Sequence, residues 1–365
     1  MELSVVILSY NVQHFLQLCL QSVEAALTTI NAEIIVIDNN SKDQSKVMVE
    51  THFPNVKWIQ NTENVGFSKA NNQAVQQAKG NYLCILNPDT VVAENTFTKL
   101  LEFAETKTDL GIVGCQLIDG NGEFLQESKR NVPTPKVALK KLLGKSDMYY
   151  ANHLEKHQIG KASIFVGAFM LLKKEVYLKV NGFDEQYFMY GEDIDLSYKI
   201  EKLGLTNYYY GNTTVIHFKG ESTLKDNVYA KRFFGAMQIF YKSHFKSNVF
   251  TNSIVWFAIQ LAKLIQKPPK QKSIAINNYV LVSNKLVPKL QMALKKSVLC
   301  VKEVTVFKSN TDYVLDLNYL KFRDVIDILK KSKEKKIISF KILPKNTNFV
   351  LGSQTSENRG EIFHF

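Results

Sequence analysis

Cysteine is scarce in this chain of 365 residues. The four cysteines, Cys19, Cys84, Cys115 and Cys300, are widely separated and show neither the spacing of metal ligands nor that of close disulfide pairs. This pattern argues against a disulfide-rich scaffold and against a metal module built on cysteine. We expect buried free thiols and a reducing compartment.

Two glycine-rich nucleotide-binding motifs are also missing. No glycine fingerprint follows the first apolar run, and GxxxxGK[ST] occurs nowhere in the chain. A Rossmann oxidoreductase and a P-loop enzyme are therefore disfavoured. The N-terminus, MELSVVILSYN, has no basic stretch and no small-residue cleavage site, so we expect a cytoplasmic protein that is not secreted.

Positive charge is concentrated in one part of the chain. The formal net charge is +12, and residues 219–308 hold 16 Lys or Arg against three acids, which gives 16 − 3 = +13 there. Such a block suits an anionic surface such as phospholipid, polyphosphate or nucleic acid, and equally a set of solvated helix faces. Within it, residues 249–265, VFTNSIVWFAIQLAKLI, fit either a helix in the membrane interface or a core helix.

The first third of the chain alternates strand-like and helical patterns. Apolar runs at 3–10, 32–40, 56–61 and 81–89 are separated by helical patterns at 15–26, 45–51 and 68–78. Strands that are apolar on both faces predict an α/β fold with a mostly parallel central sheet and helices on both sides. Ligands of such sheets bind beyond the carboxyl ends of the strands.

The rest of the chain divides into further segments. After a predicted helix at 94–105 and strand at 111–118, residues 129–161 show little periodicity, and we expect an irregular, mobile excursion. A strand, a helix, an aromatic loop and a helix beginning GEDIDL follow, and then a strand that ends near His217. QKPPKQK at 266–272 has the composition of a linker. The expected parts are 1–225, a basic and amphipathic segment at 226–272, and a small α/β domain at 273–365.

Polar residues close several predicted strands. Asp38 ends the second strand, where it can form an Asx turn or cap the next helix. Gly66 in NVGFSKANN allows a backbone to approach a ligand closely. Asp89 follows a buried strand, where a carboxylate can bind a divalent cation held mainly by phosphates and water. His217 is either a core histidine or a second ligand of that cation.

The stretch GEDIDLSYKI places Glu192, Asp193 and Asp195 in the first turn of a predicted helix. Acids there are favoured by the helix dipole, so a purely structural explanation exists. That explanation leaves the preceding loop, FDEQYFMYG, unaccounted for, and this aromatic loop can form one wall of a cleft.

Six segments occur in an order that resembles the family 2 glycosyltransferases, which have the GT-A fold. They are VVILSYN, VIDNNSKD, NTENVGFSKANNQAV, YLCILNPDT, FVGAFMLLKKEVYLKVNGFDEQYFMYGEDIDLSYKIEKLG and VIHF, over residues 3 to about 220. Each is weak alone, and the ordered set is specific. The sequence is most similar to the rhamnosyltransferase-like branch, in which LNPD replaces DxD. It departs from strict DxD at Asn87, and Lys199 stands where many relatives have arginine.

The resemblance implies an inverting transferase that moves a sugar from a UDP-, dTDP- or GDP-sugar to a glycan or lipid-linked glycan. Cell-surface polysaccharide synthesis at the inner face of the cytoplasmic membrane, with peripheral membrane contact, is the implied setting. Asp193 would be the catalytic base and Glu192 would position the acceptor, while Asp89 and His217 would hold Mg²⁺ or Mn²⁺. The implied substrate-binding residues are Ser9, Asn11, Asp38, Asn64, Gly66, Asn72, Asn87 and Gly167.

Two other functions fit part of the sequence. A sugar nucleotidyltransferase would usually carry a glycine-rich, basic loop after its first strand, and LSYNVQHF has none. A non-catalytic GT-A-like scaffold could bind a glycan or membrane through the basic half, although the retained Asp89, Asp193 and His217 argue for activity. Nucleic acid is not an expected partner, because no recognition module is present.

Overall fold

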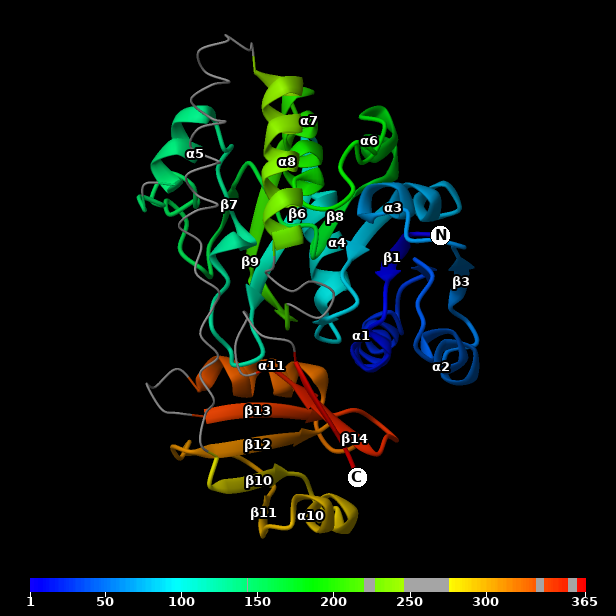
Figure 1. Cartoon of the computed structure of the whole chain (residues 1–365), viewed down its shortest axis with the longest axis vertical. Coiled ribbons are helices and arrows are strands. Elements are labelled where there is room, and N and C mark those ends of the chain that lie inside the picture. The colour runs from blue at the N-terminus through cyan, green and yellow to red at the C-terminus, as the bar shows by residue number, and fades with distance from the viewer. Residues whose placement is uncertain (143, 220–226, 246–275, 333–337, 354–359) are drawn as a thin grey trace.

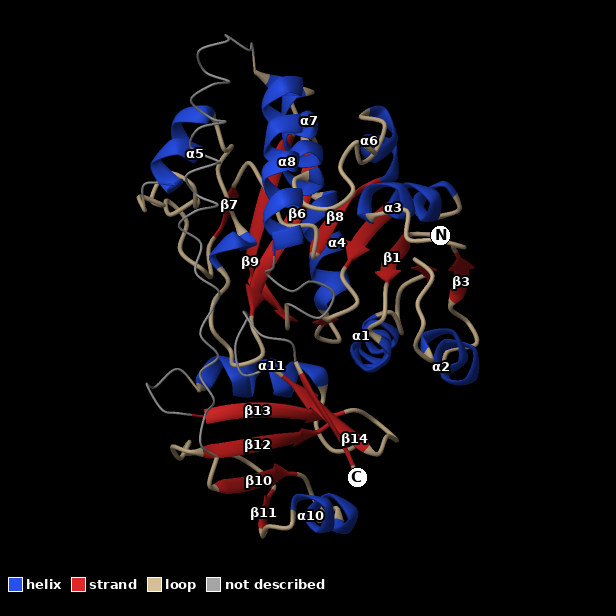
Figure 2. Cartoon of the chain, viewed as in Figure 1, coloured by secondary structure: helices blue, strands red, loops and turns tan. Residues whose placement is uncertain are grey.

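The computed structural model describes residues 1–142, 144–219, 227–245, 276–332, 338–353 and 360–365. Two sheets stand out in it, one of nine strands and one of six (Figures 1 and 2). The apolar segment at 249–265 and the linker at 266–272 lie outside the described residues, as does part of the basic block. No helix among the residues described has both the length and the apolar character needed to cross a bilayer.

The nine-stranded sheet has the order β3-β2-β1-β4-β8-β6-β9-β5, with β7 beside β9. Its strands are β1 (Leu3–Ser9), β2 (Ala32–Asp38), β3 (Lys57–Gln60), β4 (Tyr82–Leu86), β5 (Thr90–Val91), β6 (Leu110–Ile118), β7 (Ile159–Lys161), β8 (Phe169–Lys173) and β9 (Thr206–His217). From their pairings, β1, β2, β3, β4, β6 and β9 run one way, and β5, β7 and β8 run the other. The predicted mostly parallel α/β sheet is confirmed.

Helices cover both faces of this sheet because its strands bury side chains on both sides. The helices are α1 (Gln13–Ala26), α2 (Ser45–His52), α3 (Phe67–Gln76), α4 (Thr96–Glu105), α6 (Lys174–Lys179), α7 (Glu192–Lys202) and α8 (Asn227–His244), with a 3₁₀ turn at Gln126–Ser128. Val5 and Ile7 pack with residues of α1, α2 and α4. Val6 lies on the opposite face with residues of α3, α6 and α7, as strand geometry requires.

The excursion at 129–161, predicted to be irregular and mobile, is not irregular throughout. This segment contains α5 (Pro135–Leu142) and β7, and Ala151 within it is fully buried. Arg130 forms isolated β-bridges with Tyr150 and Ile164. The Arg130 N–H donates to the Ile164 carbonyl at 3.0 Å, and the Ile164 N–H donates to the Arg130 carbonyl at 2.9 Å. The order comes from pairing with distant backbone, which local periodicity in the sequence cannot reveal.

A second sheet follows, with the order β11-β10-β12-β13-β14-β15. Its elements are β10 (Asn278–Val282), α10 (Pro288–Leu294), β11 (Val298–Val301), β12 (Thr311–Asp316), α11 (Phe322–Lys331), β13 (Ile338–Leu343), β14 (Phe349–Gly352) and β15 (Glu361–His364). Strands β11, β10, β12 and β13 are parallel, and β14 is antiparallel to both of its neighbours. The predicted small α/β region is present, while its exact boundaries stay a prediction.

The two sheet regions share one hydrophobic core. Phe15 and Phe218 from the first region lie in the same buried cluster as Phe322 and Leu329 of α11. Gly122 has φ +86°, and a Cβ at this position would lie 2.1 Å from the Leu329 carbonyl oxygen, so only glycine fits. The second region is therefore docked directly on the first, and Figure 1 shows α11 between the two sheets.

Glu94 binds the start of α11 across this boundary. Its two carboxylate oxygens accept hydrogen bonds from the backbone N–H groups of Phe322 at 2.7 Å and Arg323 at 3.0 Å. These groups have no partner within the helix, and a carboxylate at a helix start is also favoured by the dipole.

We expect Glu94→Ala to lower the free energy of unfolding by about 1–2 kcal/mol, because both N–H groups of α11 lose their acceptor. Urea denaturation measures this change. Glu50→Ala, which removes a largely exposed carboxylate of α2, is the control and should change stability by less than about 0.5 kcal/mol. Equal stability of Glu94→Ala and wild type would contradict the capping role.

Candidate active site

Polar residues gather at the carboxyl edge of β1, β2 and β4. Ser9 and Asp38 are direct partners in the β1–β2 register, and the Asn39 N–H donates to the Ser9 carbonyl at 3.0 Å. Asn87 directly follows β4, the other neighbour of β1. The parallel register therefore brings together strand ends that are far apart in sequence, as expected for the ligand-binding edge of an α/β sheet.

Asp38 is a buried carboxylate that organises the loop after β2. It accepts hydrogen bonds from the Ser41 N–H at 2.7 Å, the Ser41 hydroxyl at 2.5 Å and the Gln60 amide at 2.8 Å. The Asx turn allowed by the sequence is thus present. A carboxylate has about four acceptor positions, so three donors leave one of them for a ligand.

The loop after β1 reaches the same place. The Asn11 N–H donates to Ser41 Oγ at 2.8 Å, and Asn11 Oδ1 accepts from the Lys42 N–H at 2.7 Å. Asn11 itself is exposed and has φ +55°. The Ser9 hydroxyl is fully buried and has no hydrogen-bond partner among the described residues. Asn11 therefore presents an exposed polar group beside Asp38, while Ser9 stays beneath it.

The NVGF loop is held by internal contacts. Asn64 Oδ1 accepts from the Gly66 N–H at 3.0 Å and from the Asn39 amide at 3.2 Å. Gly66 has φ +87°, and a Cβ there would lie 2.6 Å from the carbonyl oxygen of Phe188. The glycine is thus required by the close approach of the aromatic loop, before any ligand is considered.

Asn72 differs from its predicted role at the nucleotide. Its Oδ1 accepts from the Tyr177 hydroxyl at 2.6 Å and the Phe183 N–H at 3.1 Å, and its Nδ2 donates to the Phe183 carbonyl and to Glu185. All four hydrogen-bonding positions of this amide are occupied. Asn72 supports the aromatic loop and has no capacity left for a donor substrate.

Asp89 and His217 meet because β5 pairs with β9. Thr90 lies opposite His217 in this ladder, and the Phe218 N–H donates to the Asp89 carbonyl at 3.0 Å. His217 Nε2 lies 3.4 Å from both Asp89 Oδ1 and Asn87 Nδ2. Both Asp89 and His217 are buried, and His217 Nδ1 has no hydrogen-bond partner in the part of the chain that the structure describes.

This pair fits a divalent cation that takes its other ligands from substrate oxygens and water. One carboxylate oxygen and one imidazole nitrogen are donors that Mn²⁺ or Mg²⁺ accepts. Among the described residues, no group of three or more His, Cys, Asp or Glu side chains could hold a metal by itself. The protein alone therefore provides only part of a coordination shell.

The acids of GEDIDL begin α7, after Gly191 in a left-handed conformation. Asp193 Oδ2 accepts from Arg130 Nη2 at 2.6 Å and from the Gly167 N–H at 3.3 Å, and Asp193 Oδ1 accepts from the Ile194 N–H at 2.8 Å. Both side chains of the Arg130–Asp193 ion pair are about nine-tenths buried. The orientation of this carboxylate is therefore fixed.

Arg130 is the residue that sequence reasoning missed. Its Nη2 also donates to the Phe165 carbonyl at 3.0 Å. Its Nε is buried and has no hydrogen-bond acceptor among the described residues. Burial alone would lower the pKa of the guanidinium, yet the charge of Asp193 raises this pKa above its ordinary value. In the sequence, Arg130 is marked only by its place beside Lys129 and ahead of two prolines. No local pattern connects it with Asp193.

Glu192 and Asp195 occupy different environments from Asp193. Burial, with a contribution from the Asp193 charge, raises the pKa of Glu192 to about 8, and Glu192 Oε2 accepts no hydrogen bond from the residues that the structure describes. Asp195 lies 2.6 Å from His244 Nε2 and 3.0 Å from Lys199 Nζ, so it joins α7 to α8. Only Glu192 and Asp193 are placed to act at the site.

One turn connects the Asp193 group with the Asp89 group. The Asn87 N–H donates to the Ala168 carbonyl at 3.1 Å, while the preceding Gly167 contacts Asp193. The turn before β8 therefore contacts both Asp193 and Asn87, which lies two positions before Asp89. A substrate above this turn could face Asp89 on one side and Asp193 on the other.

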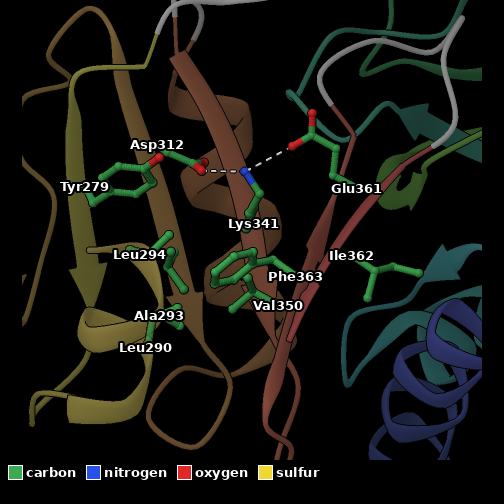
Figure 3. A pocket seen from close by; sticks show the side chains of 11 residues that line it. Tyr279, Leu290, Ala293, Leu294, Asp312, Lys341, Val350, Glu361, Ile362 and Phe363 are labelled. Carbon is green, nitrogen blue, oxygen red and sulfur yellow. Dashed lines mark hydrogen bonds and ion pairs between the residues drawn. The ribbon is translucent and has the colours of Figure 1, made fainter. Parts of the chain in front are cut away.

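A hollow of about 420 Å³ on the second sheet lies apart from these residues (Figure 3). Its charged groups pair with one another, because Lys341 contacts Asp312 at 2.5 Å and Glu361 at 3.3 Å. Tyr279, Leu294, Val350 and Phe363 supply apolar walls, and none of the predicted site residues lines it. The residues at the strand ends, and not this hollow, therefore make up the candidate active site.

Family comparison agrees with this location. The model described as glycosyl transferase family 2 matches residues 4–180, and that described as the N-terminal domain of galactosyltransferase matches residues 153–221. Together they include every residue described above at the strand-end site, from Ser9 to His217.

Two curated relatives are rhamnosyltransferases. The N-acetylglucosaminyl-diphospho-decaprenol L-rhamnosyltransferase of Mycobacterium tuberculosis is 25% identical over 244 residues, covering 61% of this chain and 78% of the relative. Rhamnosyltransferase WbbL of Escherichia coli is 26% identical over 229 residues, covering 59% and 82%. A solved structure, the mannosyltransferase PcManGT from Pyrobaculum calidifontis with GDP-Man and Mn²⁺, is 17% identical, with coverage of 72% and 73% and a TM-score of 0.49.

The ordered motifs, the sheet and the family match all refer to the same residues. Similarity to the two rhamnosyltransferases extends over most of each relative's length. Residues 4–180 match the family 2 glycosyltransferases, and the chain is similar to rhamnosyltransferase-like members of that family.

Proposed function

We propose that this glycosyltransferase inverts the configuration of the sugar that it transfers and depends on a divalent cation. The donor is a nucleoside-diphosphate sugar, and the acceptor is a hydroxyl of a lipid-linked glycan in cell-surface polysaccharide synthesis. The observation that carries the proposal is a pair of buried carboxylates near the turn before β8: Gly167 of this turn donates to Asp193, and Ala168 accepts from Asn87, two positions before Asp89.

The donor binds at the strand ends in this proposal. Asp38 uses its remaining acceptor position for the nucleotide base, with Asn11 beside it. Asp89 and His217 hold Mg²⁺ or Mn²⁺, with Asn87 next to them. The cation, when bound, neutralises the negative charge that the leaving diphosphate acquires.

The acceptor hydroxyl needs a carboxylate within hydrogen-bond reach to take its proton. We assign this role to Asp193, the carboxylate paired with Arg130, because Glu192 is largely protonated at neutral pH and cannot accept a second proton. Adjacent carboxyl groups in different environments commonly divide acid and base roles in this way. Glu192 then donates a hydrogen bond that positions the acceptor.

Arg130 positions the base. Its Nη2 and the Gly167 N–H both donate to Oδ2 of Asp193, and these hydrogen bonds keep the carboxylate in one orientation while substrates bind. The mycobacterial relative is named for a decaprenol-linked acceptor, and this name supports a lipid-linked glycan as the acceptor of the present chain.

Asp193→Asn should lower transfer at least about a thousandfold, because the acceptor proton loses its receiving group. Donor affinity should stay close to wild type, whereas the free energy of unfolding should fall by about 3 kcal/mol, because Arg130 stays buried and loses its counter-ion. Product nucleotide released with a verified acceptor measures the effect, and Asp327→Asn, at an exposed position of α11, is the matched control. Near-normal turnover of Asp193→Asn would remove Asp193 from the base role.

Asp89→Ala should weaken donor binding about ten- to a hundredfold in the presence of Mn²⁺, since one metal ligand is lost. Calorimetric titration with the donor, with and without a chelator, measures this effect. The chelator should abolish the difference between variant and wild type. Equal donor affinities in the presence of Mn²⁺ would argue against metal binding by Asp89.

Glu192→Gln should stabilise the fold at alkaline pH. The pKa of Glu192 is higher in the folded chain, at about 8, than in the unfolded chain, so wild-type stability falls as pH rises from about 4.5 to about 8. Glutamine does not titrate, and the variant should gain on the order of 1–3 kcal/mol above pH 8 and little near pH 4.5. Urea denaturation across this range tests the sign, and a pH-independent difference would contradict a buried, titrating Glu192.

A further inference from the structure

The excursion that carries Arg130 is strongly basic. Between Glu127 and Asp147 the chain has six Lys or Arg residues and no Asp or Glu, namely Lys129, Arg130, Lys136, Lys140, Lys141 and Lys145. Lys129 donates to the Ala151 carbonyl and Arg130 pairs with Asp193, so these two face inward. The remaining four are on α5 or directly after it.

Cations and apolar side chains alternate on the outer side of α5. Lys136 and Lys145 are exposed, and so are Leu139 at 39% and Met148 at 41%. Lys140 Nζ lies 3.1 Å from Met148 Sδ, which holds the two ends of this surface together. We call Lys136, Leu139, Lys140, Lys145 and Met148 the α5 surface.

The inner side of α5 packs on the protein. Val137 is buried, and Ala138 packs in the cluster that contains Phe240 and Tyr241 of α8. The Tyr241 hydroxyl donates to the Pro133 carbonyl at 2.9 Å, which fixes the start of the helix. Figure 1 shows α5 at the end of the molecule away from the second sheet, so its outer side is not covered by that region.

A short chain of contacts joins the α5 surface to the catalytic base. Lys141 Nζ lies 3.1 Å from the ring centre of Tyr149, and Tyr149 accepts a hydrogen bond from Arg130. Arg130 in turn holds Asp193 at 2.6 Å. Whatever binds the α5 surface is therefore brought next to the acceptor side of the site.

We propose that the α5 surface docks on a membrane of anionic phospholipid and so presents a lipid-linked acceptor to Asp193. Lysines that alternate with exposed apolar side chains match the interface of a bilayer, where the cations meet headgroup phosphates and the apolar groups enter the acyl boundary. Residues 136–148 hold four lysines against one acid, the exposed Asp147, so their net charge is 4 − 1 = +3 and the attraction to an anionic surface prevails. The part about the acceptor rests on the proposed function.

Vesicle co-sedimentation of the full chain tests the docking. Wild type should bind vesicles of phosphatidylglycerol and phosphatidylcholine, and bind phosphatidylcholine alone much more weakly. Lys136→Glu combined with Lys145→Glu should weaken binding to the anionic vesicles at least about tenfold. Leu139→Ser combined with Met148→Ser should weaken it several-fold at constant charge.

Val47→Ser combined with Leu178→Ser is the matched control, because these side chains are 56% and 51% exposed on α2 and α6. This control should bind like wild type. Inorganic phosphate or diphosphate should compete poorly, since a free anion offers nothing to Leu139 and Met148. Complete competition by free diphosphate, no binding of wild type to anionic vesicles, or unchanged binding of both α5 variants would overturn the proposal.

Transfer assays separate this inference from the proposed function. Each α5 variant should keep wild-type transfer to a water-soluble acceptor analogue and lose at least about tenfold with the same acceptor embedded in anionic vesicles. Loss with both acceptors would overturn the docking role, because it would point to damage at the site. Absence of transfer by wild type with either acceptor, together with intact vesicle binding, would instead reject the function.

Discussion

The buried ion pair between Arg130 and Asp193 is the interaction on which the active-site side of this protein depends. It joins the basic excursion at 129–161 to the first turn of α7 across more than sixty positions of sequence. Burying two charges is costly unless they pair with good geometry and find further hydrogen bonds. Phe165 and Gly167 supply those bonds, so the turn before β8, the excursion and the acid helix are fixed together.

The same arrangement divides the work of two neighbouring acids. Asp193 forms an ion pair with Arg130 and accepts from the Gly167 N–H, whereas Glu192 is buried beside the Asp193 charge and its Oε2 accepts no hydrogen bond from the described residues. One carboxyl is thus suited to accept a proton and the other to donate a hydrogen bond. The third acid, Asp195, pairs with His244 and Lys199 and holds α7 against α8. A single helical turn thereby serves chemistry, acceptor binding and packing.

The second sheet region supports the opposite side of the site. Phe218 directly follows His217, and its ring packs 5.1 Å from that of Phe15 in the core shared with α11. Because the Phe218 N–H also donates to the Asp89 carbonyl, the pair proposed to bind the metal lies against the boundary between the regions. This region therefore contributes to the rigidity of the site, although its own hollow lies elsewhere.

Apolar periodicity and order along the chain are local properties. They were therefore sufficient to predict the alternating elements, the mostly parallel sheet and the strand-end positions of Asp38, Asn87, Asp89 and His217. The sequence by itself also identified GEDIDL as a stretch of special interest. Only the tertiary structure decided which residues those acids meet. Arg130 lies against Asp193 because its backbone pairs with that of Ile164. The hydrogen-bonding groups of Asn72 are occupied by a loop more than a hundred positions away in the sequence. Contacts of that kind depend on register and packing between distant segments, which no local pattern encodes.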